Sequence, residues 1–162
     1  MPPWIWLGVL VFLVHDAEEV ATVQPWLEAH AAALPVLLPP LASTTTRQFA
    51  LGAAILLLGY VLAAAHGIWM IRRNSRSWPL LGVTGIFLAN GLAHLLQAVY
   101  FRGYSPGVAT AVLLALPYGY ALLRRPARIG LLSAGPLVWC IGFGMVLQLP
   151  LLLAVLAFAG SF

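Results

Sequence analysis

The chain has 162 residues, of which 62% are hydrophobic and only 7% are charged. A soluble domain would carry roughly a quarter charged residues, so this composition excludes a soluble globular protein. It predicts a single membrane-embedded domain over residues 1–162. The formal net charge is +4, but the arginines sit in short clusters beside apolar stretches, so we expect no nucleic-acid partner.

Five apolar stretches are long enough to be transmembrane helices, because about 20 apolar residues cross a hydrocarbon core of roughly 30 Å. The predicted fold is an all-α, polytopic membrane bundle in the cell (inner) membrane. The N-terminus lacks the basic start of a secretory signal, so its apolar stretch is read as the first span. The predicted spans are 4–23, 48–71, 78–101, 107–123 and 133–158.

Proline and capping residues predict where the helices begin and end. Pro25 is expected to close the first span, because proline removes a backbone hydrogen bond. Segment 24–46 is then expected to lie outside, along the membrane surface. Thr45 and Gln48 have the spacing of a capping box that opens the second span. Ser105, followed by proline, is expected to cap the fourth span.

The arginine distribution predicts the orientation of the bundle. Six of the eight arginines follow the second or the fourth span, and both of these loops must lie on the same side. The positive-inside rule makes that side cytoplasmic, which places the N-terminus in the cytoplasm. These six residues are Arg72, Arg73, Arg76, Arg124, Arg125 and Arg128.

The acidic residues are the most informative feature of the first span. All four of them lie between positions 16 and 28, and Asp16, Glu18 and Glu19 closely follow His15. A carboxylate near the bilayer centre costs roughly 2.5–3.5 kcal/mol, so three ionised ones would cost about 7–10 kcal/mol unless paired, protonated or metal-bound. This cluster is the first candidate for a functional site.

A second polar stripe is expected on the third span, where an asparagine, a histidine and a glutamine follow one another at spacings of four and three residues. Its histidine lies about 10 Å below the outer end of that span, and the glutamates lie about 9 Å below the outer end of the first. We therefore expect the two stripes to meet at one depth. The second stripe consists of Asn90, His94 and Gln97.

Imidazole and carboxylate side chains at this spacing are typical of helix-borne metal sites. The preferred interpretation has His15, Glu18 and His94 as ligands of zinc or iron, with Glu19 as a general base or fourth ligand. The protein would then be a metal-dependent enzyme acting on a lipid-like or amphiphilic substrate from the membrane. The amide side chains expected to bind that substrate are Asn90 and Gln97.

Three other interpretations remain open. Without a metal, Glu18 and Glu19 could act as acid and base in an isomerase, cyclase or hydrolase. The same groups could relay protons in a carrier, although no internal repeat supports alternating access. They could also form a structural polar core that fixes helix packing.

The remaining polar residues have simpler expectations. His66 is expected to be a helix-contact or interface histidine away from the site, and His30 a solvated surface residue. Arg47 and Arg102 are expected at the outer mouth, within reach of the acidic cluster. Gln148 could hydrogen-bond across the bundle.

Three motifs in this order resemble a known family. Residues 15–19 (HDAEE) match an HXXEE motif, 90–94 (NGLAH) an NXXXH motif and 104–110 (YSPGVAT) a YXPGXXT motif. As a set, they resemble the HXXEE-domain family of bacterial integral membrane proteins over roughly residues 5–125.

The resemblance implies functional roles for the motif residues but names no reaction. It adds Tyr104 as a gate or phenol donor beside the catalytic Glu18 and Glu19, and Thr110 as a substrate-binding residue. The simpler alternative for Tyr104 is a tyrosine of the interfacial belt. The motif residues are His15, Glu18, Glu19, Asn90, His94, Tyr104 and Thr110.

Overall fold

The computed structural model describes residues 3–30, 32, 44–73, 75, 77–124 and 134–161. Within these ranges the chain is all-α and contains no strand, as predicted. The described helices are α1 (Pro3–His30), α3 (Thr46–Ile71), α4 (Trp78–Tyr100), α5 (Val108–Thr110), the π-helical turn η2 (Ala111–Ala115), α6 (Leu116–Arg124) and α8 (Ala134–Ala159).

Each predicted span corresponds to a helix, but only three of the described helices are long and apolar enough to cross a membrane: α3, α4 and α8. The predicted span 4–23 lies within α1, which carries three acidic residues in its apolar part. The predicted span 107–123 corresponds to a shorter apolar helix, Val108–Leu122. Five crossings therefore stay a prediction.

The orientation of the bundle also stays a prediction. It depends on arginine clusters of which Arg76, Arg125 and Arg128 lie outside the described residues. Residues 33–43 of the predicted surface segment 24–46 lie outside them as well.

The prediction that Pro25 ends the first helix is wrong, because α1 continues through it to His30. Proline costs one backbone hydrogen bond, but tertiary contacts hold the turn that follows it. Leu27 is buried in an apolar cluster, and the Trp26 indole donates a hydrogen bond to the Tyr104 carbonyl at 2.9 Å. Residues 24–30 are therefore helical, and their location at the membrane surface stays a prediction.

The capping box at the start of α3 is confirmed. Thr45 is the N-cap, its side chain accepts from the Gln48 amide, and the Gln48 side chain accepts from the Thr45 amide. The predicted cap of the fourth helix is wrong. Ser105 does not cap α5, because its hydroxyl donates to the His94 carbonyl at 3.2 Å, and Gly107 precedes the helix instead.

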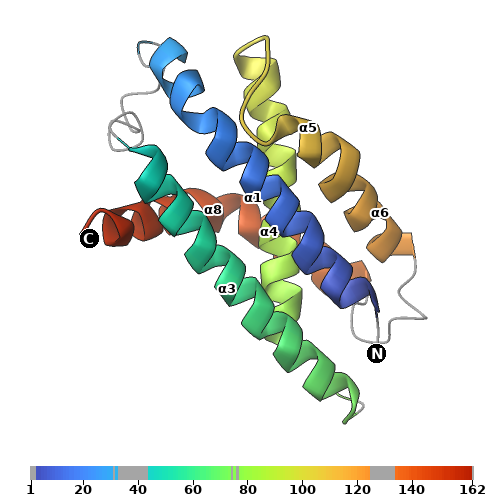
Figure 1. Cartoon of the computed structure of the whole chain (residues 1–162). Coiled ribbons are helices and arrows are strands. Elements are labelled where there is room, and N and C mark those ends of the chain that lie inside the picture. The colour runs from blue at the N-terminus through green and yellow to red at the C-terminus, as the bar shows by residue number, and fades with distance from the viewer. Residues whose placement is uncertain are drawn as a thin grey trace.

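The helices form a bundle in which α1 lies between two neighbours (Figure 1). Helix α3 packs along one side of α1, and the α5–η2–α6 helix lies on the other side. Helix α4 stands behind α1, and α8 crosses behind the others at a steep angle while packing on α4 and α3. This arrangement brings the polar faces of α1 and α4 towards the same interior.

Two apolar clusters hold the bundle together at different levels of α1. The larger one joins α1 to α3, α4, α6 and α8 through buried side chains such as Phe12, Tyr60 and Phe87. The ring of Phe12 packs edge-on against both other rings, at centroid distances of 5.4 and 5.0 Å. The smaller cluster, defined here as the upper cluster, consists of Val23, Leu27, Phe49 and Leu156. His15, Asp16, Glu18 and Glu19 of α1 lie between these two clusters.

Candidate functional site

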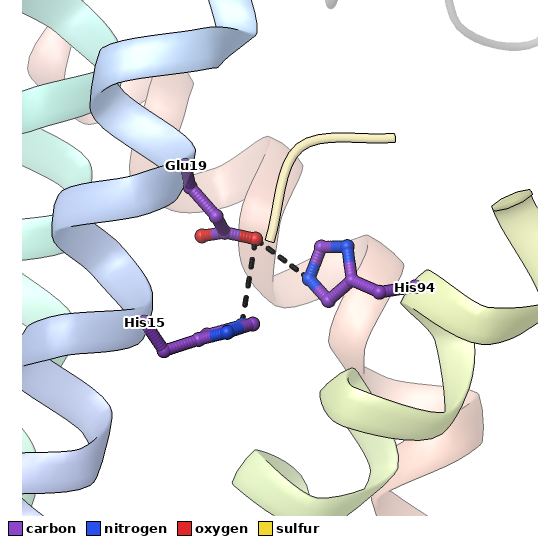
Figure 2. Close-up of side chains that lie close together, drawn as sticks. All are labelled: His15, Glu19 and His94. Atoms are coloured by element: carbon purple, nitrogen blue, oxygen red, sulfur yellow. Dashed lines mark ion pairs between the residues drawn. The ribbon is translucent and has the colours of Figure 1, made fainter. Parts of the chain in front are cut away.

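The centre of the site is the carboxylate of Glu19, which lies between two histidine rings (Figure 2). Glu19 Oε1 is 2.6 Å from His94 Nε2 and 3.7 Å from His15 Nε2. The two rings approach edge to face with centroids 4.9 Å apart. His15 is fully buried and His94 is 5% exposed. The predicted meeting of the first and third spans at one polar level is confirmed.

The hydrogen bonds of His15 determine which of its nitrogens carries the proton. Its Nδ1 lies 2.8 Å from the Thr110 hydroxyl oxygen, and that hydroxyl donates to the Gly107 carbonyl at 3.2 Å. Because the hydroxyl proton is already used, Nδ1 must be the donor to Thr110. The lone pair of Nε2 therefore faces Glu19 and the amide nitrogen of Asn90, which is 3.1 Å away.

Glu18 does not face the two histidines, although it was predicted to be a ligand. Its Oε1 accepts from the Tyr104 hydroxyl at 2.7 Å and from the Ala109 amide at 3.2 Å. Its Oε2 accepts from the Thr110 amide at 2.7 Å. The structure thus places the carboxylate of Glu19, not that of Glu18, beside the imidazoles. Glu18 instead ties residues 104–110 to α1.

Tyr104 is the predicted gate or phenol donor, and Thr110 is a predicted substrate-binding residue. Neither side chain lines the cavity described below. The Tyr104 hydroxyl donates to Glu18 and lies 3.2 Å from the Thr22 hydroxyl. Partial burial raises the pKa of the Tyr104 phenol, which keeps it protonated as a hydrogen-bond donor. Both residues position the acidic face of α1 in this structure.

Gly107 packs directly over the histidines and Glu19. Its φ of +80° lies in the left-handed region that favours glycine. A Cβ at this position would come within 2.9 Å of His15 Cε1, 3.0 Å of Glu19 Cγ and 3.1 Å of His94 Cε1. The glycine of the YXPGXXT motif is therefore required both for its backbone conformation and for the space it leaves. It covers the site from the side of the 104–107 turn.

A cavity of about 540 Å³ lies against this site, and its lining is mostly apolar. Helix α1 lines it from Phe12 to Leu27, a rise of about 22 Å, with Glu19 near the middle. Members of both apolar clusters border it. The polar residues that line it are Asp16, Glu19, Asn90, His94, Gln97 and Gln148, together with the Tyr60 and Tyr100 phenols. Of the predicted substrate-binding residues, Asn90 and Gln97 thus line the cavity and Thr110 does not.

The cavity has an exposed rim between α4 and α8. Leu96 and Tyr100 on α4 line it and are 60% and 69% exposed, and Leu149 on α8 is exposed as well. These rim side chains lie on the outer surface of the bundle, so the cavity is open to that surface on the side of Leu96 and Tyr100.

Asp16 and Gln148, which had no firm predicted role, both line this cavity. Asp16 is only 7% exposed, and its Oδ2 has no hydrogen-bond partner among the described residues. The buried Oε1 of Gln148 likewise has none in the described part of the chain. Buried acceptors without partners are uncommon in folded proteins.

The other polar residues lie away from the site. His66 contacts the Ser77 hydroxyl at 2.8 Å, so it joins the end of α3 to the start of α4, as a helix-contact histidine would. His30 is not a freely solvated residue, because it stacks on Trp26 with ring centroids 4.7 Å apart. The side chains of Arg47 and Arg102 are exposed, and within the described ranges neither forms an ion pair with the acidic cluster.

His15, Glu19 and His94 are able to hold a metal ion. Each offers one ligand atom, and these atoms lie within 4.8 Å of one another. Among the described residues, the ring nitrogens of His94 contact only the Glu19 carboxylate, which is 2.6 Å from Nε2. The proton of His15 is held on Nδ1 by Thr110, an arrangement typical of metal-bound histidines. Two imidazoles and a carboxylate suit zinc or iron.

Several residues that shape the site were missed by the sequence analysis. Ser105 holds the 104–107 turn to the His94 carbonyl, and Trp26 holds it through the Tyr104 carbonyl. Gly107 covers the histidines. Only Gly107 had a signal in the sequence, because a proline–glycine pair between two helices indicates a tight turn.

Residues 6–122 match the family described as "Protein of unknown function with HXXEE motif". This match covers more than half of the chain, which therefore belongs to the HXXEE family. No curated protein and no solved structure matches the chain. The HXXEE motif, after which the family is described, supplies His15, Glu18 and Glu19 of the site described above.

Proposed function

We propose that this protein is a multi-pass membrane enzyme that uses a metal ion, zinc or iron, held by His15, Glu19 and His94. Its substrate is a lipid-like or amphiphilic molecule that enters the cavity from the membrane. The observation that carries the proposal is the position of Glu19, between two buried imidazoles in the wall of an apolar cavity with an exposed side.

The bound metal would supply Lewis-acid polarisation of a substrate oxygen or an activated water at neutral pH. The chain's own residues would orient and protect this centre. Thr110 keeps the proton of His15 on Nδ1, and Asn90 contacts the opposite nitrogen. Gly107 and the hydrogen bonds of Glu18 hold the 104–110 segment over the site, where it excludes water.

The cavity supports an apolar substrate. Its lining is mostly apolar, and its volume is in the range of small-molecule sites. Because Glu19 lies near the middle of the α1 lining, a substrate in the cavity would have apolar contacts on both sides of its reacting group. A lipid-like molecule meets this requirement, whereas a small polar metabolite would leave most of the cavity unfilled.

A metal-free acid–base enzyme is the second candidate, because the 2.6 Å contact between Glu19 and His94 also suits a directly paired carboxylate and imidazolium. In that case Glu19 and His94 would exchange a proton with the substrate, and no ion would be required.

Metal analysis of the purified, folded protein separates these two functions. We expect near-stoichiometric zinc or iron in the wild type and its loss in His15→Ala, His94→Ala and Glu19→Gln. His30→Ala is the matched control, because this histidine lies on α1 outside the cavity lining.

The neighbouring glutamates provide the sharpest comparison. Glu18→Gln removes the same charge as Glu19→Gln, but its carboxylate faces the 104–110 segment. We therefore expect Glu18→Gln to keep its metal. A wild type that binds no zinc or iron even after titration, yet is folded, would refute the metal site and favour the acid–base enzyme.

A further inference from the structure

The cavity contains a second polar feature that the metal site does not use. Asp16 Oδ2 and Gln148 Oε1 are buried acceptors without a hydrogen-bond partner among the described residues, and both side chains line the cavity. They come from different helices, α1 and α8. Two separate helices thus present the same kind of group to one cavity.

The chemistry of these two atoms selects the group that would bind them. A carboxylate oxygen and an amide carbonyl oxygen accept hydrogen bonds, so a complementary ligand must donate them. An anionic head, such as a carboxylate or a phosphate, would bring further acceptors beside Asp16 and Glu19. In the described part of the chain, the basic groups that contact this acidic cluster are the imidazoles of His15 and His94, both at Glu19, and no arginine offsets the charge.

The rest of the cavity lining indicates that the part of the ligand beyond its headgroup is apolar. Beyond Glu19 the cavity is bordered by the upper cluster, which offers aliphatic and phenyl surface but no polar atom. A chain of methylene groups fits this surface, and the exposed rim at Leu96 and Tyr100 gives such a chain a way in.

We infer that Asp16 and Gln148 bind the protonated headgroup of a primary amine, whose N–H groups can donate to both acceptors, while its alkyl chain lies along the apolar wall. This inference deepens the proposed function, because it names the substrate class of the same cavity. The binding itself requires no metal. Asp16 and Gln148 act as binding residues that hold the head, beside the ligands that hold the metal.

The test compares three ligands with one alkyl chain and different heads: dodecylamine, dodecanol and dodecanoate. Native mass spectrometry of the full-length protein released from detergent counts the bound molecules. We expect dodecylamine to be retained more strongly than dodecanol, whose single O–H can donate to only one of the two acceptors, and dodecanoate to be lost. Asp16→Asn should weaken the binding of the amine more than that of the alcohol.

Two variants on different helices make the test independent of one substitution. Asp16→Asn and Gln148→Leu should each weaken dodecylamine binding about tenfold, since the first removes the charge that pairs with the ammonium group and the second removes a buried hydrogen-bond acceptor. Glu28→Gln is the matched control, because it removes a carboxylate of α1 that does not line the cavity. We expect it to bind like the wild type. If Asp16→Asn does not fold, Gln148→Leu carries the test alone.

Dodecanol or dodecanoate retained as strongly as dodecylamine would overturn the inference. So would unchanged binding in folded Asp16→Asn or Gln148→Leu protein, which would mean that water satisfies these acceptors. Repeating the measurement with His94→Ala protein separates the two proposals. If His94→Ala protein still binds the amphiphile and the wild type holds no metal, the metal site alone is refuted. If the wild type holds metal but binds no amphiphile, this inference alone is refuted.

Discussion

Gly107 lies in the turn that covers the site, and we expect Gly107→Ala to destabilise the protein strongly although it adds only one methyl group. A left-handed backbone costs a non-glycine residue about 1–2 kcal/mol. The new methyl group would also lie 2.9–3.1 Å from carbon atoms of His15, Glu19 and His94, and overpacking of this kind costs about 1–3 kcal/mol. We therefore expect a loss of about 2–5 kcal/mol in the free energy of unfolding.

The assay is reversible unfolding in mixed micelles, followed by circular dichroism, together with metal content. Gly59→Ala is the control, because a Cβ there would meet nothing within 4 Å. Gly107→Asn separates the two causes, since asparagine tolerates the left-handed region but still carries the Cβ. It should recover part of the stability and none of the metal binding. A Gly107→Ala protein as stable and as metal-loaded as the wild type would refute the close packing of Gly107 over the site.

Two further predictions follow from contacts of α1. Thr110→Val removes the acceptor for His15 Nδ1 and should lower metal affinity about 10–100-fold in a chelator competition, whereas Thr110→Ser should restore it. Unchanged affinity in the valine variant would contradict the assigned proton position. Pro25→Ala restores a backbone hydrogen bond inside α1 and should raise the free energy of unfolding by about 1–3 kcal/mol. A destabilised Pro25→Ala protein would show that the proline is required for the path of α1.

The common depth of the polar residues on α1 and α4 was predictable, because it depends on local, periodic patterns in the sequence. The acidic residues of α1 lie close together, and the NXXXH spacing places Asn90 and His94 on one face of α4. Counting residues from the outer ends of the two spans places the α1 glutamates and His94 at similar depths, and this count requires no knowledge of helix packing. The capping box of Thr45 was predictable for the same reason, since it depends only on residues three apart.

The roles of the two adjacent glutamates were not predictable. Glu18 and Glu19 are about 100° apart on α1, and either could face His94 after a modest rotation of the helix. That rotation depends on contacts far away in the chain, such as the hydrogen bond from the Thr110 amide to Glu18. A helical-wheel projection of α1 alone contains no information about these distant contacts.

The sequence by itself determined that this chain is helical and apolar, and that histidine and carboxylate side chains share one level of it, because periodicity and composition act within single helices. Only the tertiary structure decided that Glu19 pairs with the histidines, that Gly107 covers them and that Asp16 and Gln148 line the adjacent cavity. These features arise where α1, α4, α8 and the 104–110 segment meet, and the free energy of that packing depends on all of these elements together. The continuation of α1 through Pro25 has the same origin, since the contacts of Trp26 and Leu27 outweigh a local helix-breaking preference.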